Sequence, residues 1–234
     1  KFLVLFVNTL GRLSFRQAEL RAILELSGCQ DAPMAWTRAD DPTGEDSIFM
    51  EVDLPSEDVA RSVAERAICI KGIFEPWGSG STPEECWQAV SQYPDDRKLP
   101  YLAEGTTFKI NVMTYGTTKD KDNSKQIIES CFDHVDFKGK VVMDNSKKGV
   151  RTAKGAVRAS NQFWWMEDAG YIHLAGAAAR DHPPYRVFFC REVARCQRHL
   201  LDQYDLKKRE YLCTTSMTAE NSFLVANFAH ARPG

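Results

Sequence analysis

Seven basic side chains fall within 21 residues in the middle of the chain: Lys138, Lys140, Lys147, Lys148, Arg151, Lys154 and Arg158. Cationic side chains at this density can engage several phosphates of a polyanion, and each neutralised phosphate makes binding more sensitive to salt. Residues 145–161 lack apolar periodicity, which predicts an exposed loop. A solvated loop without a partner would show the same pattern, so this cluster alone leaves both interpretations open.

Charge is distributed unevenly along the chain, although the net charge is only -2. Residues 1–105 carry 10 basic and 18 acidic side chains, residues 106–160 carry 11 and 6, and residues 161–234 carry 9 and 8. A basic middle region beside an acidic first region is what a localised polyanion site requires. This asymmetry favours an RNA contact over chance clustering.

A compact aromatic cluster, Phe163-Trp164-Trp165, could stack on unpaired bases. Adjacent large aromatic residues more often pack in a core, and Phe163–Met166 is expected to form a single helical turn. In regular structure, one of Trp164 and Trp165 points away from the other. The outward tryptophan is therefore the stacking candidate.

The run Asp181-His182-Pro183-Pro184-Tyr185 is similar to the Asp/Asn-Pro-Pro-Tyr loop with which amino-methyltransferases receive the amino protons of a target base. His182 interrupts that motif, and no glycine-rich turn after an upstream strand supplies a cofactor site. We therefore interpret the run as a proline-rich turn that leads into a strand over 186–193. No catalytic residue is assigned.

The seven cysteines and five histidines are scattered. No C-x-x-C, H-x-x-x-H or H-E-x-x-H spacing is present, so the sequence predicts no metal site. Neither a G-x-S-x-G elbow nor a P-loop is found. No apolar run approaches the ~18 residues that a membrane span requires.

The first module should alternate strands and helices. Strands are expected over 2–8, 47–54 and 68–77, and helices should begin at Ser14, Ser56 and Thr82. Gly28 is the expected C-cap of the first helix. This β-α-β-α-β order is that of a ferredoxin-like α+β module.

Residues 95–104 are polar, contain Pro100 and are expected to link two modules. In the second module, strands are expected over 106–115, 139–143 and 186–193, with a helix over 124–132 and a short helix or turn over 196–204. A strand over 209–214 and a helix over 215–231 should close the chain.

Three stretches resemble one known family. They are Leu54–Arg61 with Arg66-Ala67 and Ile73–Gly78, then Tyr93-Pro94 to Phe108–Ile110, and finally Lys207–Arg209 with Thr215–Met217 and Asn227. In this order they resemble the THUMP-domain tRNA guanosine-N2 methyltransferases that act at tRNA position ten. The resemblance covers most of the chain, and residues 133–185 depart from it most.

The resemblance implies an α+β chain with a ferredoxin-like domain over 1–94 and a THUMP RNA-binding domain over 95–206. Residues 207–234 would be a linker and the first helix of a truncated class I methyltransferase domain. Such a chain would bind the acceptor end of tRNA and present the guanosine at position ten to a catalytic domain that is absent here. Lys207, Lys208 and Arg209 then join the seven basic residues above as expected RNA contacts.

Cofactor and activator would belong to the full-length enzyme. S-adenosylmethionine and a small zinc-binding activator subunit are expected on the absent domain, so this chain alone should hold no cofactor and catalyse no reaction. The scattered cysteines indicate reduced thiols in a cytosolic or organellar compartment, and we expect a cytoplasmic protein. Two other classes stay open: a noncatalytic THUMP-type RNA-binding or ribonucleoprotein-assembly protein, and a scaffold whose acidic first module binds a basic partner.

Overall fold

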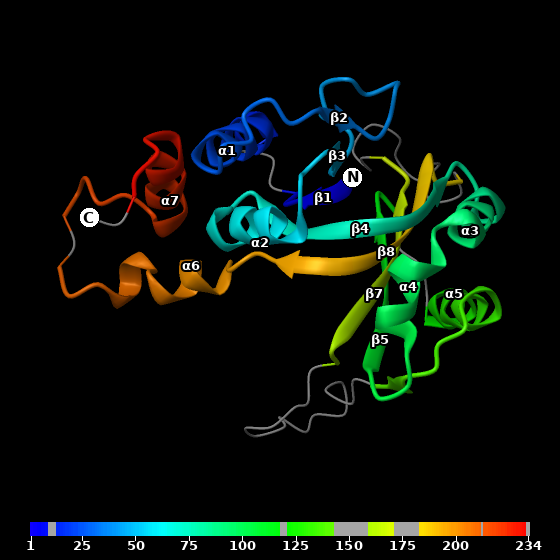
Figure 1. Ribbon diagram of the computed structural model, residues 1–234. Coiled ribbons are helices and arrows are strands. Elements are labelled where there is room, and N and C mark those ends of the chain that lie inside the picture. The colour runs from blue at the N-terminus through cyan, green and yellow to red at the C-terminus, as the bar shows by residue number, and fades with distance from the viewer. Residues whose placement is uncertain (9–12, 118–120, 143–158, 171–182, 212, 233–234) are drawn as a thin grey trace. The chain divides into compact units, whose positions relative to one another are not determined.

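The computed structural model describes residues 1–8, 13–117, 121–142, 159–170, 183–211 and 213–232. They form two compact units, Lys1–Glu75 with Val193–Gly234, and Pro76–Glu192. Two long strands, β4 (Ile70–Gly80) and β8 (Arg186–Arg195), contribute residues to both units. Figure 1 shows the elements in chain order from blue to red.

The first unit contains an antiparallel sheet in the order β2-β3-β1-β4. Its strands are β1 (Phe2–Phe6), β2 (Met34–Trp36), β3 (Phe49–Val52) and the first part of β4. Leu3 lies opposite Glu51 on one side and Phe74 on the other, and every residue of β1 is buried. This central position explains the continuous apolar run at the start of the chain.

Helices complete the first unit. They are α1 (Leu13–Leu26), α2 (Glu57–Arg66), α6 (His199–Gln203), the 3-10 helix η5 (Leu206–Lys208) and α7 (Ala219–Phe228). In Figure 1, α7 lies beside α1, although some 200 residues separate them in the sequence. The predicted strand over 209–214 is wrong, because the described residues of that stretch form no strand.

Local signals set most helix ends in the first unit. Ser56 accepts a hydrogen bond from the Val59 amide at 3.3 Å, as an N-cap should, and Gly28 ends α1 at φ +70°. Ser14 does not cap α1, since it lies inside the helix. Thr218 caps α7 by accepting from Asn221, so this helix starts later than expected.

The second unit carries the strand order β4-β8-β7-β5-β6. Its elements are the end of β4, α3 (Pro83–Gln92), α4 (Asp95–Leu102), β5 (Thr107–Tyr115), α5 (Lys121–His134), β6 (Lys140–Val141), β7 (Asn161–Asp168) and most of β8. β5 is parallel to β6 and β7, whereas β7 and β8 are antiparallel.

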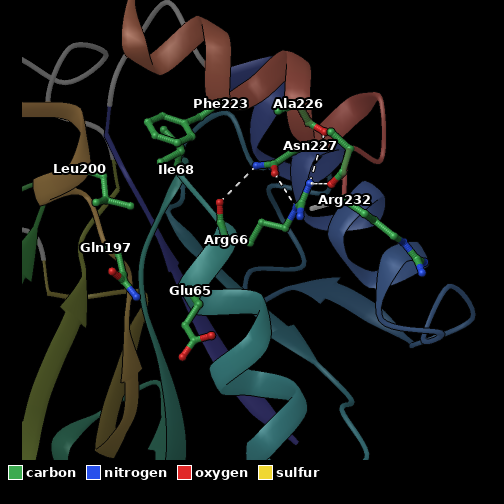
Figure 2. A pocket seen from close by; sticks show the side chains of 10 residues that line it. Glu65, Arg66, Ile68, Gln197, Leu200, Phe223, Ala226, Asn227 and Arg232 are labelled. Atoms are coloured by element: carbon green, nitrogen blue, oxygen red, sulfur yellow. Dashed lines mark hydrogen bonds between the residues drawn. The ribbon is translucent and has the colours of Figure 1, made fainter. Parts of the chain in front are cut away.

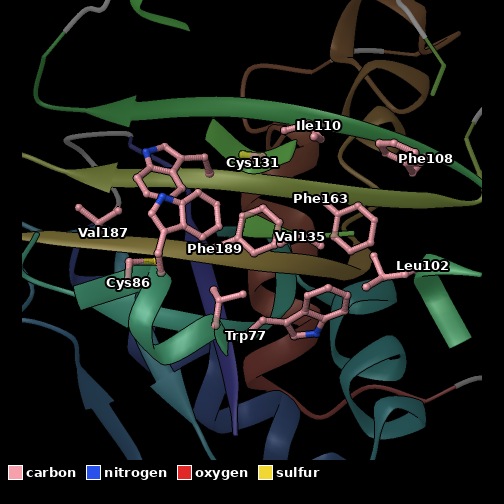
Figure 3. Packing of buried hydrophobic residues seen from close by; sticks show 13 residues of the cluster. Trp77, Cys86, Leu102, Phe108, Ile110, Cys131, Val135, Phe163, Val187 and Phe189 are labelled. Carbon is pink, nitrogen blue, oxygen red and sulfur yellow. The ribbon is translucent and has the colours of Figure 1, made fainter. Parts of the chain in front are cut away.

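The core of this unit is a cluster of buried apolar side chains, shown in Figure 3. We call its aromatic members the ring cluster: Trp77, Trp87, Phe108, Phe163, Trp165 and Phe189. Phe163 lies inside it, with its ring 5.1 Å from that of Trp77 and 5.1 Å from that of Phe137. Phe163 and Trp165 occupy alternate positions of the strand β7. The predicted helical turn over 163–166 is therefore wrong. Aromatic residues that alternate between core and the opposite face favour a strand.

Two further sequence predictions change in the second unit. Residues 95–104 are no simple linker, because α4 forms there and buries Leu102. The strand predicted over 68–77 is longer than expected, because β4 continues through Gly78 to Gly80. A Cβ at Gly78 would lie 2.4 Å from the Cys86 carbonyl oxygen, so this glycine lets α3 approach the strand closely.

Candidate nucleic-acid interface

Lys138 and Lys140 mark an exposed basic edge of the second unit. The Lys138 amide donates to the Leu102 carbonyl at 2.9 Å, and the Lys140 amide donates to Thr106 at 2.9 Å, so the backbone is fixed while both side chains extend into solvent. Lys138 Nζ lies 2.6 Å from the Asp136 carboxylate, and both side chains are more than half exposed. An exposed pair of this kind is worth ~0–1 kcal/mol, so a phosphate could replace the carboxylate.

Five of the predicted RNA contacts, Lys147, Lys148, Arg151, Lys154 and Arg158, lie outside the described residues, as do Asp181 and His182. Pro183, Pro184 and Tyr185 lead directly into β8, and the Tyr185 amide donates to the Asp168 carbonyl at 2.7 Å.

Lys207, Lys208 and Arg209 belong to the first unit, on and just after η5. All three side chains are exposed. The Lys208 ammonium donates to the Asp202 carbonyl, and the Asp205 side chain accepts from the Lys207 amide at 2.8 Å. The local backbone therefore presents three adjacent cations to solvent.

The two tryptophans of β7 point to opposite faces of the strand, as predicted. Trp165 is buried in the ring cluster, whereas Trp164 is half-buried on the other face. The Trp164 indole N–H donates to the Glu192 carboxylate at 3.0 Å, which fixes the ring orientation. Trp164 is thus the tryptophan that satisfies the stacking criterion set from the sequence.

Polar neighbours of Trp164 on β5 and β7 were missed from the sequence. Asn111 lies opposite Trp164, and Lys109 lies opposite Gln162, on the face of the sheet away from the ring cluster. The Asn111 amide donates to the Gln162 side chain at 3.0 Å. The alternation of apolar residues over 106–115 was the available signal, because it already assigned Phe108 and Ile110 to the core face.

Comparison with known proteins identifies the family. The family model described as Tmrp11 THUMP N-terminal domain matches residues 1–198. The chain belongs to this family. The resemblance noted from the sequence is thereby confirmed.

Curated relatives point the same way. The chain is 32% identical over 220 residues to the tRNA (guanine(10)-N(2))-methyltransferase TRMT11 of Mus musculus, a match that covers 94% of this chain and 43% of that protein. It is 33% identical to TRMT11 of Homo sapiens, over 92% and 41% of the two chains. Identity to the tRNA (guanine(10)-N(2))-methyltransferase of Saccharomyces cerevisiae is 28%, over 100% and 48%. The chain therefore spans less than half the length of these relatives.

A joint of polar side chains holds α7 to the rest of the first unit of this THUMP-family chain. The Glu19 carboxylate, fully buried, accepts hydrogen bonds from the amides of Ile68 at 2.9 Å and Cys69 at 2.7 Å, and from the Asn227 side chain at 2.8 Å. Asn227 in turn accepts from Arg66 Nε at 2.8 Å. We call Glu19, Arg66 and Asn227 the Glu19 joint.

A cavity of about 280 Å³ adjoins this joint, with Arg66 and Asn227 in its lining (Figure 2). Arg66 is not available to an anion there, because its guanidinium donates to Asn227 and to the Ala231 carbonyl. The contacts of Arg66 thus stabilise the C-terminal segment.

Neither a metal site nor a membrane span is found in the part of the chain that the structure describes. Among these residues, no group of three or more His, Cys, Asp or Glu side chains is arranged to hold a metal ion. No helix within the described ranges is long and apolar enough to cross a membrane.

Proposed function

We propose that this chain is the tRNA-recognition region of an S-adenosylmethionine-dependent tRNA (guanine(10)-N(2))-methyltransferase. The observation that carries the proposal is the family match over residues 1–198, together with relatives of that printed activity over more than nine-tenths of the chain. The chain would bind the acceptor end of tRNA and present the guanosine at position ten to a catalytic domain. S-adenosylmethionine and a zinc-binding activator subunit would bind that domain, in the cytoplasm.

The topology supports part of the proposed domain scheme. The element order β1-α1-β2-β3-α2-β4, with the strand order β2-β3-β1-β4, fits a ferredoxin-like domain within residues 1–94. The proposal then assigns 95–206 to the THUMP domain, and 207–234 to a linker with the first helix of a methyltransferase domain. The division into compact units differs, since it groups Val193–Gly234 with the first unit.

Different residues would contact the phosphates and the bases of the tRNA. Lys138 and Lys140, with Lys147, Lys148, Arg151, Lys154 and Arg158, would contact phosphates from the second unit. Lys207, Lys208 and Arg209 would do so from the first unit. Trp164 would stack on an unpaired base, because its half-exposed indole is held in one orientation by Glu192.

The experiment is filter binding of an unmodified tRNA transcript to the chain between 50 and 200 mM salt. We expect saturable binding that weakens with salt, and Lys138→Ala/Lys140→Ala should flatten the slope by roughly 0.7–0.9 for each phosphate that the variant no longer neutralises. The triple variant of Lys147, Lys148 and Arg151 to Ala should act in the same direction.

A matched control removes equal charge elsewhere. Lys1 and Arg21 are exposed residues of the first unit, so Lys1→Ala/Arg21→Ala should leave the salt slope unchanged. Absence of saturable binding at 50 mM salt would overturn the proposed function. If the control variant flattened the salt slope equally, the phosphate contacts would not lie at the proposed residues.

A further inference from the structure

A second cavity, of about 380 Å³, opens on the second unit between the start of α3, one face of α5 and the end of β7. Its lining includes Trp87, Asn123, Gln126, Ser130, Trp165 and Glu167. This volume is in the range of sites for small organic ligands. All of these residues belong to one unit and are separate from the basic edge and from the face that carries Trp164.

Two indoles form the apolar wall of the cavity. Trp87 is 7% exposed, and its ring centroid lies 4.8 Å from that of Trp165. His134 stacks on Trp87 at 4.6 Å with an interplanar angle of 7°. The rings therefore hold one another in fixed positions, and the wall they form suits a flat aromatic ligand.

The polar groups of the cavity come from α5 and from the buried end of β7. Asn123 and Gln126 are exposed amides, which offer both a donor and an acceptor. The Glu167 side chain is 2% exposed, and its carboxylate accepts the Trp165 indole N–H at 2.8 Å. None of the described residues that line this cavity is Lys or Arg, so they offer no cation to a phosphate.

We propose that this cavity receives one unpaired nucleobase of the bound RNA, with an amino group of the base directed towards Glu167. The inference rests on the proposed function and adds a base-specific site to it. Carboxylate oxygens accept hydrogen bonds from N–H groups, as Glu167 does from the Trp165 indole. Adenine, cytosine and guanine carry an exocyclic amino group that can donate to it, whereas uracil carries none. The two amides reach the remaining edge of the base, and the indoles exclude water from it.

The first experiment fills the cavity from its exposed side. Gln126→Trp places an indole in the cavity, whereas Gln88→Trp makes the same change on an exposed position of α3 outside it. Blocking one base–aromatic contact should weaken binding of an unmodified tRNA transcript about 10-fold, within the range of ~1–3 kcal/mol for such contacts. Gln88→Trp should bind within about twofold of the wild type, and equal melting temperatures of the two variants would exclude misfolding as the cause.

Outcomes of this experiment separate the two proposals. Wild-type affinity of Gln126→Trp would overturn the base site and leave tRNA recognition intact. Absence of tRNA binding by the wild-type chain would instead overturn the proposed function.

The second experiment tests the amino group. Oligoadenylate should bind the wild-type chain more tightly than oligouridylate and should shift the Trp165 indole N–H resonance. Glu167→Gln keeps the size of the side chain but adds N–H donors, and it should reduce the preference for adenylate at least threefold. Equal affinity of the wild type for the two oligonucleotides would overturn the proposal. Tight binding of adenosine monophosphate that tRNA fails to displace would also overturn it, because the ligand would then be a free nucleotide.

Discussion

In the second unit, rings from β4, β5 and β8 surround Phe163 of β7, whereas in the first unit a single carboxylate, Glu19 of α1, joins α7 and the two residues that precede β4. The ring cluster is held by apolar burial, which does not depend on direction. The Glu19 joint is held by hydrogen bonds, each of which requires its own partner. The two units should therefore respond differently when one side chain is removed.

The largest effect is expected from Phe163→Ala. Phe163 is fully buried and lies within 6.3 Å of the rings of Trp77, Phe108, Phe137 and Phe189. Its truncation should lower the free energy of unfolding by about 3–5 kcal/mol. Urea unfolding followed by intrinsic fluorescence measures this change. Phe132→Ala is the control, because that ring contacts the same cluster but is 47% exposed. A similar decrease in both variants would mean that burial does not govern stability here.

Glu19→Ala should lower the free energy of unfolding by a smaller amount, about 2–3 kcal/mol. The substitution leaves the amides of Ile68 and Cys69 and the Asn227 side chain without their carboxylate acceptor, and hydrogen bonds to charged groups contribute ~1.5–3 kcal/mol. Glu25→Ala tests the same change on the same helix, at a side chain that is 52% exposed and near His230. That control should cost less than about 1 kcal/mol. Equal costs would argue that the joint contributes no more than a surface contact.

How far the sequence predicts these two regions depends on the kind of interaction. The strand over 106–115 was predicted from the alternation of Phe108, Ile110 and Val112, and β5 forms there. Helix starts at Ser56 and Thr82 were predicted, and each of these side chains accepts a hydrogen bond from the amide three residues further on. Apolar periodicity and helix caps depend on residues that lie only a few positions apart. Both can therefore be predicted from the sequence.

The Glu19 joint carries no such local signal. Glu19 and Asn227 are 208 residues apart in the sequence. Nothing in the residues around Glu19 indicates that its side chain is buried in the folded protein. The strand β2 was missed, since only three residues form it. In the candidate site, the sequence predicted that one of Trp164 and Trp165 points outward but not which one, and the neighbours of Trp164, Asn111 and Gln162, meet only through strand register.

Asn227→Ala should act more locally than Glu19→Ala. It removes the side chain that connects Glu19 with Arg66, at a cost of about 1–2 kcal/mol. We expect faster amide hydrogen exchange in 219–228 and unchanged exchange in 108–112, which belongs to the other unit. Asn221→Ala, in the first turn of the same helix, serves as the control. Unchanged exchange in 219–228 would show that apolar contacts alone hold α7.

The last prediction concerns the reactivity of cysteine thiols. Their labelling reports which of the two units opens. Hydrogen bonds from Ser216 and Thr215 lower the pKa of the exposed Cys213 thiol to about 7. Burial raises the pKa of Cys69, in the first unit, and of Cys131, in the second, to about 12. Because the thiolate is the reactive form, iodoacetamide at neutral pH should label Cys213 first.

Ser216→Ala should slow that reaction by raising the pKa of Cys213. Glu19→Ala should then accelerate labelling of Cys69 but not of Cys131, and Phe163→Ala should do the reverse. Peptide mass spectrometry distinguishes the two thiols. If both variants exposed both thiols at the same rate, the units would open together, and the difference between ring cluster and polar joint would not extend to their unfolding.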